Sequence, residues 1–381
     1  MTPRNRVRIA LNHCEPDRVP MDLGATVVST IHQTSYRNLV NHLGLKDDQM
    51  KVMASHVNTM VVGEEIQKRF ELDFVRVAMK PASSYRMEYD KDAKSFADEY
   101  GTVWTRGDNE TGIHYPSAHP LAGADIDAIK AFKLPDMRDR SRVDGLPELV
   151  KDLYENTDYA IVVDGMFQTL QRCYDLYGME DFLVDLMTDR VKARTLLDKV
   201  AENALDGIEL CIRAVGDYAD VFTFADDLGS QNAPMFSSAI YKRFIKPYHK
   251  LFVEKCRKYS NAKLLLHCDG AITTFLDDIA DAGFDILNPL QCSARDMDPA
   301  FLKKEYGKHF SFWGGVDSQT VMSHGSPKDV EEEVRRMIDI MGEGGGYVLG
   351  NVHVIEHEIK PENIVALFDS GLRFGRYDDR E

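Results

Sequence analysis

The stretch KLLLHCDGAITTFLDDIADAGFDILNPLQ, residues 263–291, reads as a strand, a helix and a second strand in succession. Its two apolar runs, 263–270 and 284–291, lack the alternation of a half-exposed strand. This is the pattern expected of parallel strands that are covered on both faces. The segment ITTFLDDIADAG between them has the usual length of a connecting helix. The stretch therefore predicts one β–α–β unit of a parallel sheet.

Apolar runs of the same kind recur along the chain, and helix-like segments separate the later ones. Strict alternation of eight strands with helices favours a single closed (β/α)8 TIM barrel over an open doubly wound sheet. No internal repeat, linker or low-complexity segment interrupts the pattern, so we expect one domain over residues 1–381. The eight strand-like runs span residues 18–24, 72–78, 159–165, 219–227, 263–270, 284–291, 309–317 and 346–353.

One segment departs from this alternation. Residues 84–118, which include YRMEYD and GTVWTRG, read as a β-hairpin inserted after the second strand. Long barrels often carry insertions, and we expect this one to roof the mouth of the barrel. Later in the chain, helices are expected over 326–344 and 361–375. The first of these has a Ser-Pro start and the stop at Gly342 that are ordinary helix punctuation.

The composition of the 381 residues is that of an ordinary globular protein, with 44% hydrophobic and 28% charged residues. The formal net charge of −16 argues against nucleic acid and anionic lipid as partners. The N-terminal segment lacks the apolar core of a secretory signal, and no run approaches the roughly 18 apolar residues that span a bilayer. Six scattered cysteines without a C-x-x-C pair suit a reducing compartment. We therefore expect a cytoplasmic protein without a membrane segment.

Polar residues collect where the predicted strands end. In a barrel of this kind the carboxyl ends of the strands face the active site, so convergence of these side chains indicates a functional site. Any single aspartate among them is equally well explained as a helix cap or turn residue. The strand-end polar residues are Asp164, Asp226, Asp227, Gln231, His267, Asp269, Asn288, Gln291, Asp317, Gln319, Asn351 and His353.

His267, Cys268 and Asp269 lie in one extended segment. Residues i and i+2 of a strand share a face, so His267 and Asp269 point together into the mouth, whereas Cys268 points toward the helices. An imidazole and a carboxylate on one face suit either a divalent metal such as Zn²⁺ or an acid–base pair. A third metal ligand has to come from another strand, and His353 is the candidate.

Two further motifs bear on the site. The string HVIEH, residues 353–357, matches the H-x-x-E-H of one class of zinc protease, but that class needs a helix and here the string follows a strand. We therefore expect His357 to be a solvated loop residue. The adjacent Asp226 and Asp227 could share a proton, orient a histidine or bind a cationic group, and one of them is expected to cap the next helix.

These motifs together resemble those of the uroporphyrinogen decarboxylase superfamily, which also contains the corrinoid-dependent methyltransferases of methanogens and acetogens. The resemblance covers essentially the whole chain, is strongest from Asp226 to Asn363, and implies a TIM barrel. No single motif determines the reaction. The motifs are DDLGSQ (226–231), IKPYHK (245–250), LLHCDGAI (265–272), AGFDILNPLQ (282–291), WGGVDSQ (313–319), GGGYVLGNVH (344–353) and PENI (361–364).

Two departures from the superfamily pattern bear on the reaction. Uroporphyrinogen decarboxylases resemble one another in an R-Q-A-G-R motif that grips substrate carboxylates, whereas residues 20–26 here read PMDLGAT. Thiol-methylating members bind zinc through an H-x-C pair and a later cysteine, and the matching positions here are His267, Asp269 and His353. The resemblance thus implies a zinc site of nitrogen and oxygen ligands, which favours an oxygen-bearing methyl donor over a thiol.

The resemblance implies a corrinoid-dependent methyltransferase of the demethylating, O-demethylase kind. It would move a methyl group from a small methoxylated or methylated compound to cobalamin held by a separate corrinoid protein, and a homodimer is compatible with this role. His267, Asp269 and His353 would hold the metal. The other implied roles are catalytic for Asp226, Asp227 and His267, and substrate-binding for Asp164, Gln231, Asn288, Gln291, Asp317 and Asn351.

Two other functions are open at this point. A metal-free decarboxylase would use the aspartates as proton donors, with His353 in a purely substrate-binding role. A non-catalytic barrel that binds a corrinoid carrier is the third hypothesis. The number of polar residues at the strand ends argues against this third hypothesis, because a barrel without activity has no need of them.

Overall fold

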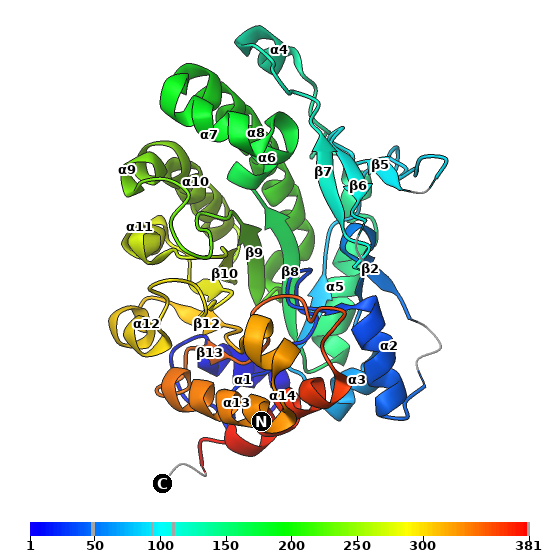
Figure 1. The fold of residues 1–381 in the computed structure, drawn as a ribbon, viewed down its shortest axis with the longest axis vertical. Coiled ribbons are helices and arrows are strands. Elements are labelled where there is room, and N and C mark those ends of the chain that lie inside the picture. Colours follow the sequence, from blue (N-terminus) through cyan, green and yellow to red (C-terminus); the bar gives the residue numbers. More distant parts are fainter. Residues whose placement is uncertain (47–49, 93, 109–110, 379–381) are drawn as a thin grey trace.

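Seven parallel strands form one curled sheet in a computed structural model that describes residues 1–46, 50–92, 94–108 and 111–378 (Figure 1). The order in the sheet is β13–β12–β11–β10–β9–β8–β4. Seven of the eight predicted runs are thus confirmed as strands. They are β4 (Phe74–Val77), β8 (Ala160–Phe167), β9 (Val221–Ala225), β10 (Lys263–His267), β11 (Ile286–Asn288), β12 (Ser311–Trp313) and β13 (Tyr347–Val348).

The eighth predicted run, 18–24, joins the two edges of this sheet without forming a regular strand. On the β13 side, the backbone N–H of Asp22 donates to the carbonyl of Leu349 at 2.9 Å. On the β4 side, the N–H of Asp73 donates to the carbonyl of Met21 at 3.1 Å. The architecture is therefore α/β, with a curled parallel sheet like that of a TIM barrel.

Helices surround the sheet (Figure 1). The expected helix over 326–344 is found as α13, where Ser326 and Asp329 form a capping box and the helix ends before Gly342. Within the described ranges, none of the helices combines the length and apolar character that crossing a membrane requires. The helices are α1 (Pro3–Ala10), α2 (Gln33–His42), α3 (Glu64–Arg69), α4 (Ile126–Ala131), α5 (Leu146–Asn156), α6 (Leu170–Tyr177), α7 (Met179–Thr188), α8 (Arg190–Val215), α9 (Ser238–Ile240), α10 (Lys246–Arg257), α11 (Leu276–Ala282), α12 (Pro299–Tyr306), α13 (Pro327–Met341) and α14 (Pro361–Phe374).

Two small antiparallel sheets lie outside the parallel one. Residues 84–118, predicted as a hairpin, carry three strands in the order β5–β6–β7, and a second sheet has the order β1–β3–β2. The two sheets meet where the amide of Asn58 donates to the carbonyl of Thr111 at 3.0 Å. Their strands are β1 (Ile31–His32), β2 (Val52–Ala54), β3 (Thr59–Met60), β5 (Ser95–Ala97), β6 (Val103–Arg106) and β7 (His114–Ala118).

A small apolar cluster, here called the lumen cluster, fills the inside of the curled sheet. Helix α1 and the residue after it contribute Val7 and Leu11, and each of the seven strands contributes at least one residue. Alternate strand residues belong to the large core beneath the helices, as a side-chain period of two requires. The strand members of the lumen cluster are Phe74, Ala160, Val162, Val221, Leu265, Ile286, Trp313 and Val348.

At the amino ends of the strands, here called the base, an aspartate directly precedes three of the seven strands. Asp73 stands before β4, Asp220 before β9 and Asp285 before β11. Each carboxylate accepts a backbone N–H from a neighbouring segment at 2.7 to 2.8 Å. Ion pairs and backbone hydrogen bonds therefore hold this end together. The ion-paired arginines are Arg6 and Arg18 on Asp73, Arg8 on Asp220, and Arg257 on Asp285.

Candidate functional site

Five neighbouring strand positions lie two residues beyond the lumen cluster, toward the carboxyl ends, and all five are polar. They are Arg76 on β4, Asp164 on β8, Thr223 on β9, His267 on β10 and Asn288 on β11. The residue two positions earlier in each strand belongs to the lumen cluster, so these side chains face the same lumen. All except Arg76 are buried. We call these five residues the mouth layer.

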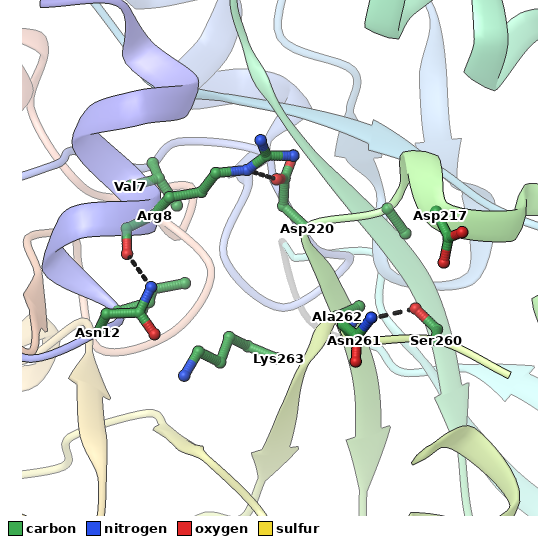
Figure 2. Close-up of a pocket in the computed structure, with 11 residues that line it drawn as sticks. Val7, Arg8, Asn12, Asp217, Asp220, Ser260, Asn261, Ala262 and Lys263 are labelled. Atoms are coloured by element: carbon green, nitrogen blue, oxygen red, sulfur yellow. Dashed lines mark hydrogen bonds and ion pairs between the residues drawn. The ribbon is translucent and has the colours of Figure 1, made fainter. Parts of the chain in front are cut away.

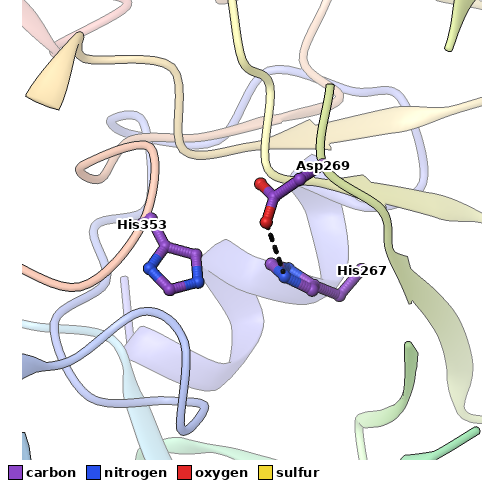
Figure 3. A group of neighbouring side chains, drawn as sticks. All are labelled: His267, Asp269 and His353. Atoms are coloured by element: carbon purple, nitrogen blue, oxygen red, sulfur yellow. Dashed lines mark ion pairs between the residues drawn. The ribbon is translucent and has the colours of Figure 1, made fainter. Parts of the chain in front are cut away.

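The three residues predicted to hold a metal lie together at the mouth (Figure 3). Their candidate ligand atoms are all within 4.8 Å of one another. Nε2 of His267 is 3.4 Å from Oδ2 of Asp269. The ring centroids of His267 and His353 are 5.6 Å apart. Because His353 follows β13 and the other two residues end β10, this group, here called the metal group, joins strand ends that are distant in the sequence.

Two neighbours orient the metal group. Nδ1 of His267 lies 2.7 Å from Oδ1 of Asn288. An amide oxygen accepts and does not donate, so Nδ1 carries a proton and Nε2 faces Asp269. The amide of Asn288 in turn donates to the carbonyl of Trp313 at 3.5 Å. On the other side, the backbone N–H of Asp269 donates to Oδ1 of Asp227 at 3.0 Å. Asp227 therefore positions the segment that carries Asp269.

The group is strongly coupled electrostatically. Burial lowers the pKa of His267, but the carboxylates of Asp269 and Asp227 outweigh burial and raise that pKa to about 9. Burial raises the pKa of Asp269, but the imidazolium of His267 outweighs it and lowers that pKa to about 2. Burial lowers the pKa of His353. Without a bound cation, the group at neutral pH is therefore an imidazolium–carboxylate pair beside a neutral imidazole.

This donor set fits Zn²⁺. Tetrahedral zinc with bonds of about 2.0 to 2.1 Å keeps its ligand atoms about 3.4 Å apart, and His267 and Asp269 already have that separation. Within the described ranges, the ring of His353 has no hydrogen-bond partner, so its nitrogens are available. A ligating histidine commonly donates its other ring N–H to an oxygen, as His267 does to Asn288.

Asp226, predicted as a catalytic residue, lies outside the metal group. Its side chain is 1% exposed and accepts the backbone N–H groups of Thr169, Leu170 and Gln171 at 2.8 to 3.1 Å. Its other oxygen lies 3.0 Å from Nε2 of His249. Asp226 therefore caps α6, which precedes it in the chain, and not the helix that follows it. This placement corrects the prediction, because the carboxylate does not face the mouth.

An open pocket of about 280 Å³ adjoins the metal group, and Asp269 and His353 line it. Gln231 and Gln291, both predicted for substrate binding, also line this pocket. Nε2 of Gln291 donates to Oε1 of Gln231 at 2.9 Å, and Oε1 of Gln291 accepts the N–H of Gly270 at 2.7 Å. The pocket thus brings a pair of amide side chains to the metal group.

The other predicted substrate-binding residues have partners within the protein and do not line this pocket. Asp164 pairs with Arg76. Asp317 accepts the N–H of Gln319 at 2.9 Å and so caps the turn at 318–322. The amide of Asn351 donates to the carbonyl of His353 at 2.9 Å. Asn351 therefore supports the loop that carries a predicted metal ligand.

The segment 353–357 is not helical, which excludes the zinc-protease hypothesis for HVIEH. His357 lies in a loop, as predicted, but it is partly rather than fully solvated, because its side chain is 26% exposed and its ring centroid lies 5.7 Å from that of His32. The orientation predicted for Cys268 is confirmed. Its side chain is buried in the core beneath the helices, where Sγ accepts the N–H of Leu228 at 3.3 Å.

A second pocket, of about 350 Å³, lies at the base (Figure 2). Arg8, Asp220 and Lys263 are among the charged residues that line it. In Figure 2, Arg8 reaches across to Asp220, with which it pairs at 2.7 Å. Active sites of such barrels lie at the carboxyl ends of the strands, so this pocket is not the candidate site.

Sequence reasoning missed two residues of the mouth layer, Arg76 and Thr223. Both lie inside strands, whereas the predicted site residues were sought where strands end. The alternation in FVRV, residues 74–77, is the signal that would have found Arg76, because it places Arg76 on the same face as Phe74.

The fold and the site together define a TIM-barrel-like α/β protein whose candidate site lies at the carboxyl ends of its parallel strands. Residues 114–373 match the uroporphyrinogen decarboxylase (URO-D) family. The chain belongs to this family.

Two kinds of relatives differ in how much of the chain they match. A uroporphyrinogen decarboxylase from Pseudomonas fluorescens is 30% identical over 178 residues, which is 46% of each chain. The matched stretch thus spans about half the length of that decarboxylase. The methylcobamide:CoM methyltransferase MtaA from Methanosarcina barkeri is 23% identical over 370 residues, 96% of each chain. A solved methyltransferase from Methanosarcina mazei superposes with a TM-score of 0.66 at 20% identity, over 98% of this chain and 99% of that one.

Proposed function

We propose that the protein is a zinc-assisted, corrinoid-dependent methyltransferase. It moves a methyl group from a small methoxylated or methylated substrate to the cobalamin of a separate corrinoid protein. The observation that carries this proposal is the metal group, whose candidate ligand atoms lie within 4.8 Å of one another beside a pocket lined by amides. The similarity to MtaA over 96% of both chains supports the methyltransferase branch.

Each residue of the site has a distinct part in this reaction. Zn²⁺ held by His267, Asp269 and His353 would supply Lewis-acid activation of the substrate oxygen. Asn288 keeps Nε2 of His267 directed at the mouth, and Asp227 holds the backbone of Asp269. In the overall reaction the methyl–oxygen bond breaks, the methyl group bonds to Co(I), and the substrate oxygen leaves as a hydroxyl after taking up a proton.

Metal analysis of the purified protein, prepared without chelators, tests the site. We expect near-stoichiometric zinc in the native protein and little in His267→Ala, since three ligands are needed for tight binding. Asn12→Ala, at the base, is the matched control and should keep its zinc. A native protein without zinc would remove the main support of the mechanism.

A second experiment tests the reaction. The protein is mixed with Co(I) cobalamin and a panel of methyl ethers, and the spectrum of methylated cobalamin is followed. We expect formation by the native protein and none by His267→Ala. Failure across the panel would favour the second candidate.

The second candidate is a metal-free decarboxylase. The charged pair of His267 and Asp269, with Nε2 and Oδ2 3.4 Å apart, favours it because such a pair can donate a proton without a metal. Release of CO₂ from a carboxylic acid by chelator-treated protein would support this function. Loss of activity on chelation would exclude it.

A further inference from the structure

The mouth layer contains one arginine, Arg76, which does not belong to the metal group. Arg76 lies on β4 two residues after Phe74, a member of the lumen cluster, so its side chain points into the lumen at the carboxyl end. The R-Q-A-G-R arginines of decarboxylases are absent from residues 20–26. The guanidinium of Arg76 therefore comes from β4, and not from the segment 20–26 that matches the arginine motif of the decarboxylases.

Asp164 holds Arg76 by one nitrogen. Nε of Arg76 lies 2.5 Å from Oδ2 of Asp164, whose side chain is fully buried. The same carboxylate accepts the hydroxyl of Thr223 at 3.0 Å and the backbone N–H of Val27 at 2.9 Å. Three donors thus stabilise the charge of Asp164, and the buried carboxylate orients the guanidinium.

The two terminal nitrogens of Arg76 remain available. Within the described ranges, neither Nη1 nor Nη2 makes a hydrogen bond or ion pair, and the side chain is 25% exposed. The paired, parallel N–H groups of a guanidinium edge match the two oxygens of a carboxylate. A guanidinium that is oriented by a buried partner loses little conformational freedom when it binds such a group.

We propose that Arg76 binds a carboxylate of the substrate. The substrate is then a small methylated or methoxylated carboxylic acid, with its methyl-bearing end at the metal group and its acid end at Arg76. The identity of the methyl-bearing end rests on the proposed function, whereas the carboxylate site rests on Arg76 and Asp164 alone.

The positions in the sheet limit the length of such a substrate. Arg76 and His267 lie on β4 and β10, which are three strand spacings apart in the order β4–β8–β9–β10. With about 4.8 Å between strands, the two positions are roughly 14 Å apart along the sheet. The path across the curled lumen is shorter, because both side chains point inward. A substrate that reaches both groups therefore spans less than roughly 14 Å.

Binding of matched pairs of probes tests the proposal. One pair is 3-methoxybenzoate and 3-methoxybenzyl alcohol, and the other is methoxyacetate and 2-methoxyethanol. We expect calorimetry to show that the native protein binds the carboxylate of at least one pair about tenfold more tightly than the alcohol. Equal binding within both pairs, or no binding of either carboxylate at millimolar concentration, would overturn the proposal.

Variants then test whether Arg76 is the residue that favours carboxylates over alcohols. Arg76→Gln combined with Asp164→Asn removes both charges and leaves no unpaired ion in the lumen, and it should bind both members of each pair equally. Arg76→Lys should keep part of the preference. Arg138→Met, which removes a surface arginine that pairs with Asp206, is the matched control and should behave as native. If the double variant does not fold, an unchanged preference in Arg76→Lys would overturn the proposal, because a lysine cannot bind bidentately.

Zinc content and methyl transfer, measured on the same samples, separate the two proposals. The double variant should keep its zinc, because neither residue belongs to the metal group. If the native protein binds carboxylates through Arg76 but contains no zinc and transfers no methyl group, this result would contradict the proposed function. The carboxylate site would still stand. Methyl transfer with no preference for acids would contradict the carboxylate site alone.

Discussion

The two ends of the curled sheet carry the same kinds of charged side chains but use them differently. At the base, Asp73 has arginine partners at 2.6 and 2.9 Å as well as a backbone N–H. At the mouth, Nε2 of His267 and Oδ2 of Asp269 stand 3.4 Å apart, and within the described ranges the ring of His353 has no hydrogen-bond partner. Charges that are fully paired hold the fold, whereas groups left available beside a pocket are those that can bind a ligand.

Pocket size does not distinguish the two ends. The pocket at the base, of about 350 Å³, is larger than the pocket of about 280 Å³ at the mouth. At the base, however, Arg8 pairs with Asp220 at 2.7 Å across the lining. The chemistry of the lining, and not its volume, therefore identifies the candidate site.

The largest expected effect is on stability, at the base. Asp73→Ala leaves Arg6 and Arg18 buried without their shared partner, so we expect the free energy of unfolding to fall by about 3 to 5 kcal/mol. Urea denaturation measures this change. Glu331→Ala, which breaks an exposed ion pair with Arg373, should change stability by less than about 1 kcal/mol. A loss below about 1 kcal/mol in Asp73→Ala would show that the base is not held by this carboxylate.

The next effect is on metal binding, at the mouth. Asn288→Ala removes the oxygen that orients His267, and we expect zinc affinity to fall about 10- to 100-fold. Competition with a chromophoric chelator measures the affinity. Asn12→Ala at the base should leave the affinity unchanged. Native affinity in Asn288→Ala would mean that the imidazole is held by other contacts.

A smaller effect is on the pH dependence of the metal-free protein. Folding raises the pKa of His267 from 6.5 to about 9, so its stabilising contribution is complete below pH 6.5 and is lost as the pH rises through 9. Because the side chain of Asp269 is 34% exposed, we expect a loss on the order of 1 to 2 kcal/mol.

Unfolding at a series of pH values, with native protein and His267→Gln, measures the loss. The variant should be insensitive to pH over the same interval. An equal loss in both proteins would assign it to other groups.

The smallest effect is again at the base. The side chain of Arg8 is 43% exposed, so Arg8→Ala should destabilise the fold by less than about 1 kcal/mol although its ion pair is as short as those of Asp73. Thermal unfolding measures the difference from Asp73→Ala. A comparable loss of stability in both variants would show that burial does not determine how much these ion pairs stabilise the fold.

The sequence predicts the parallel sheet well because buried parallel strands are continuous apolar runs. The run 18–24 is an exception, since Pro20 has no N–H for a strand ladder. Residues 84–118 carry three strands of three to five residues, which are too short for an alternation to separate them from a hairpin. The sheet formed by β1, β2 and β3 has strands of two or three residues and has no recognisable pattern in the sequence.

Part of the site is predictable from spacing within one strand. His267 and Asp269 follow from their i, i+2 spacing in an extended segment. The role of Asp226 does not follow, because its partners Thr169 and His249 belong to other segments and meet it through packing. For the same reason the sequence does not show that Asp164 holds Arg76, 88 positions away.

Helix α1 has a consequence for how the protein is made. Arg4 on this helix binds the carbonyls of Tyr154 and Thr157, and Arg8 pairs with Asp220, which lies 212 positions along the chain. At a synthesis rate of about 5 to 20 residues per second, the helix waits on the order of 10 to 40 s for that partner to emerge from the ribosome. Helix α1 therefore completes its packing late, because its partner Asp220 directly precedes β9 in the chain.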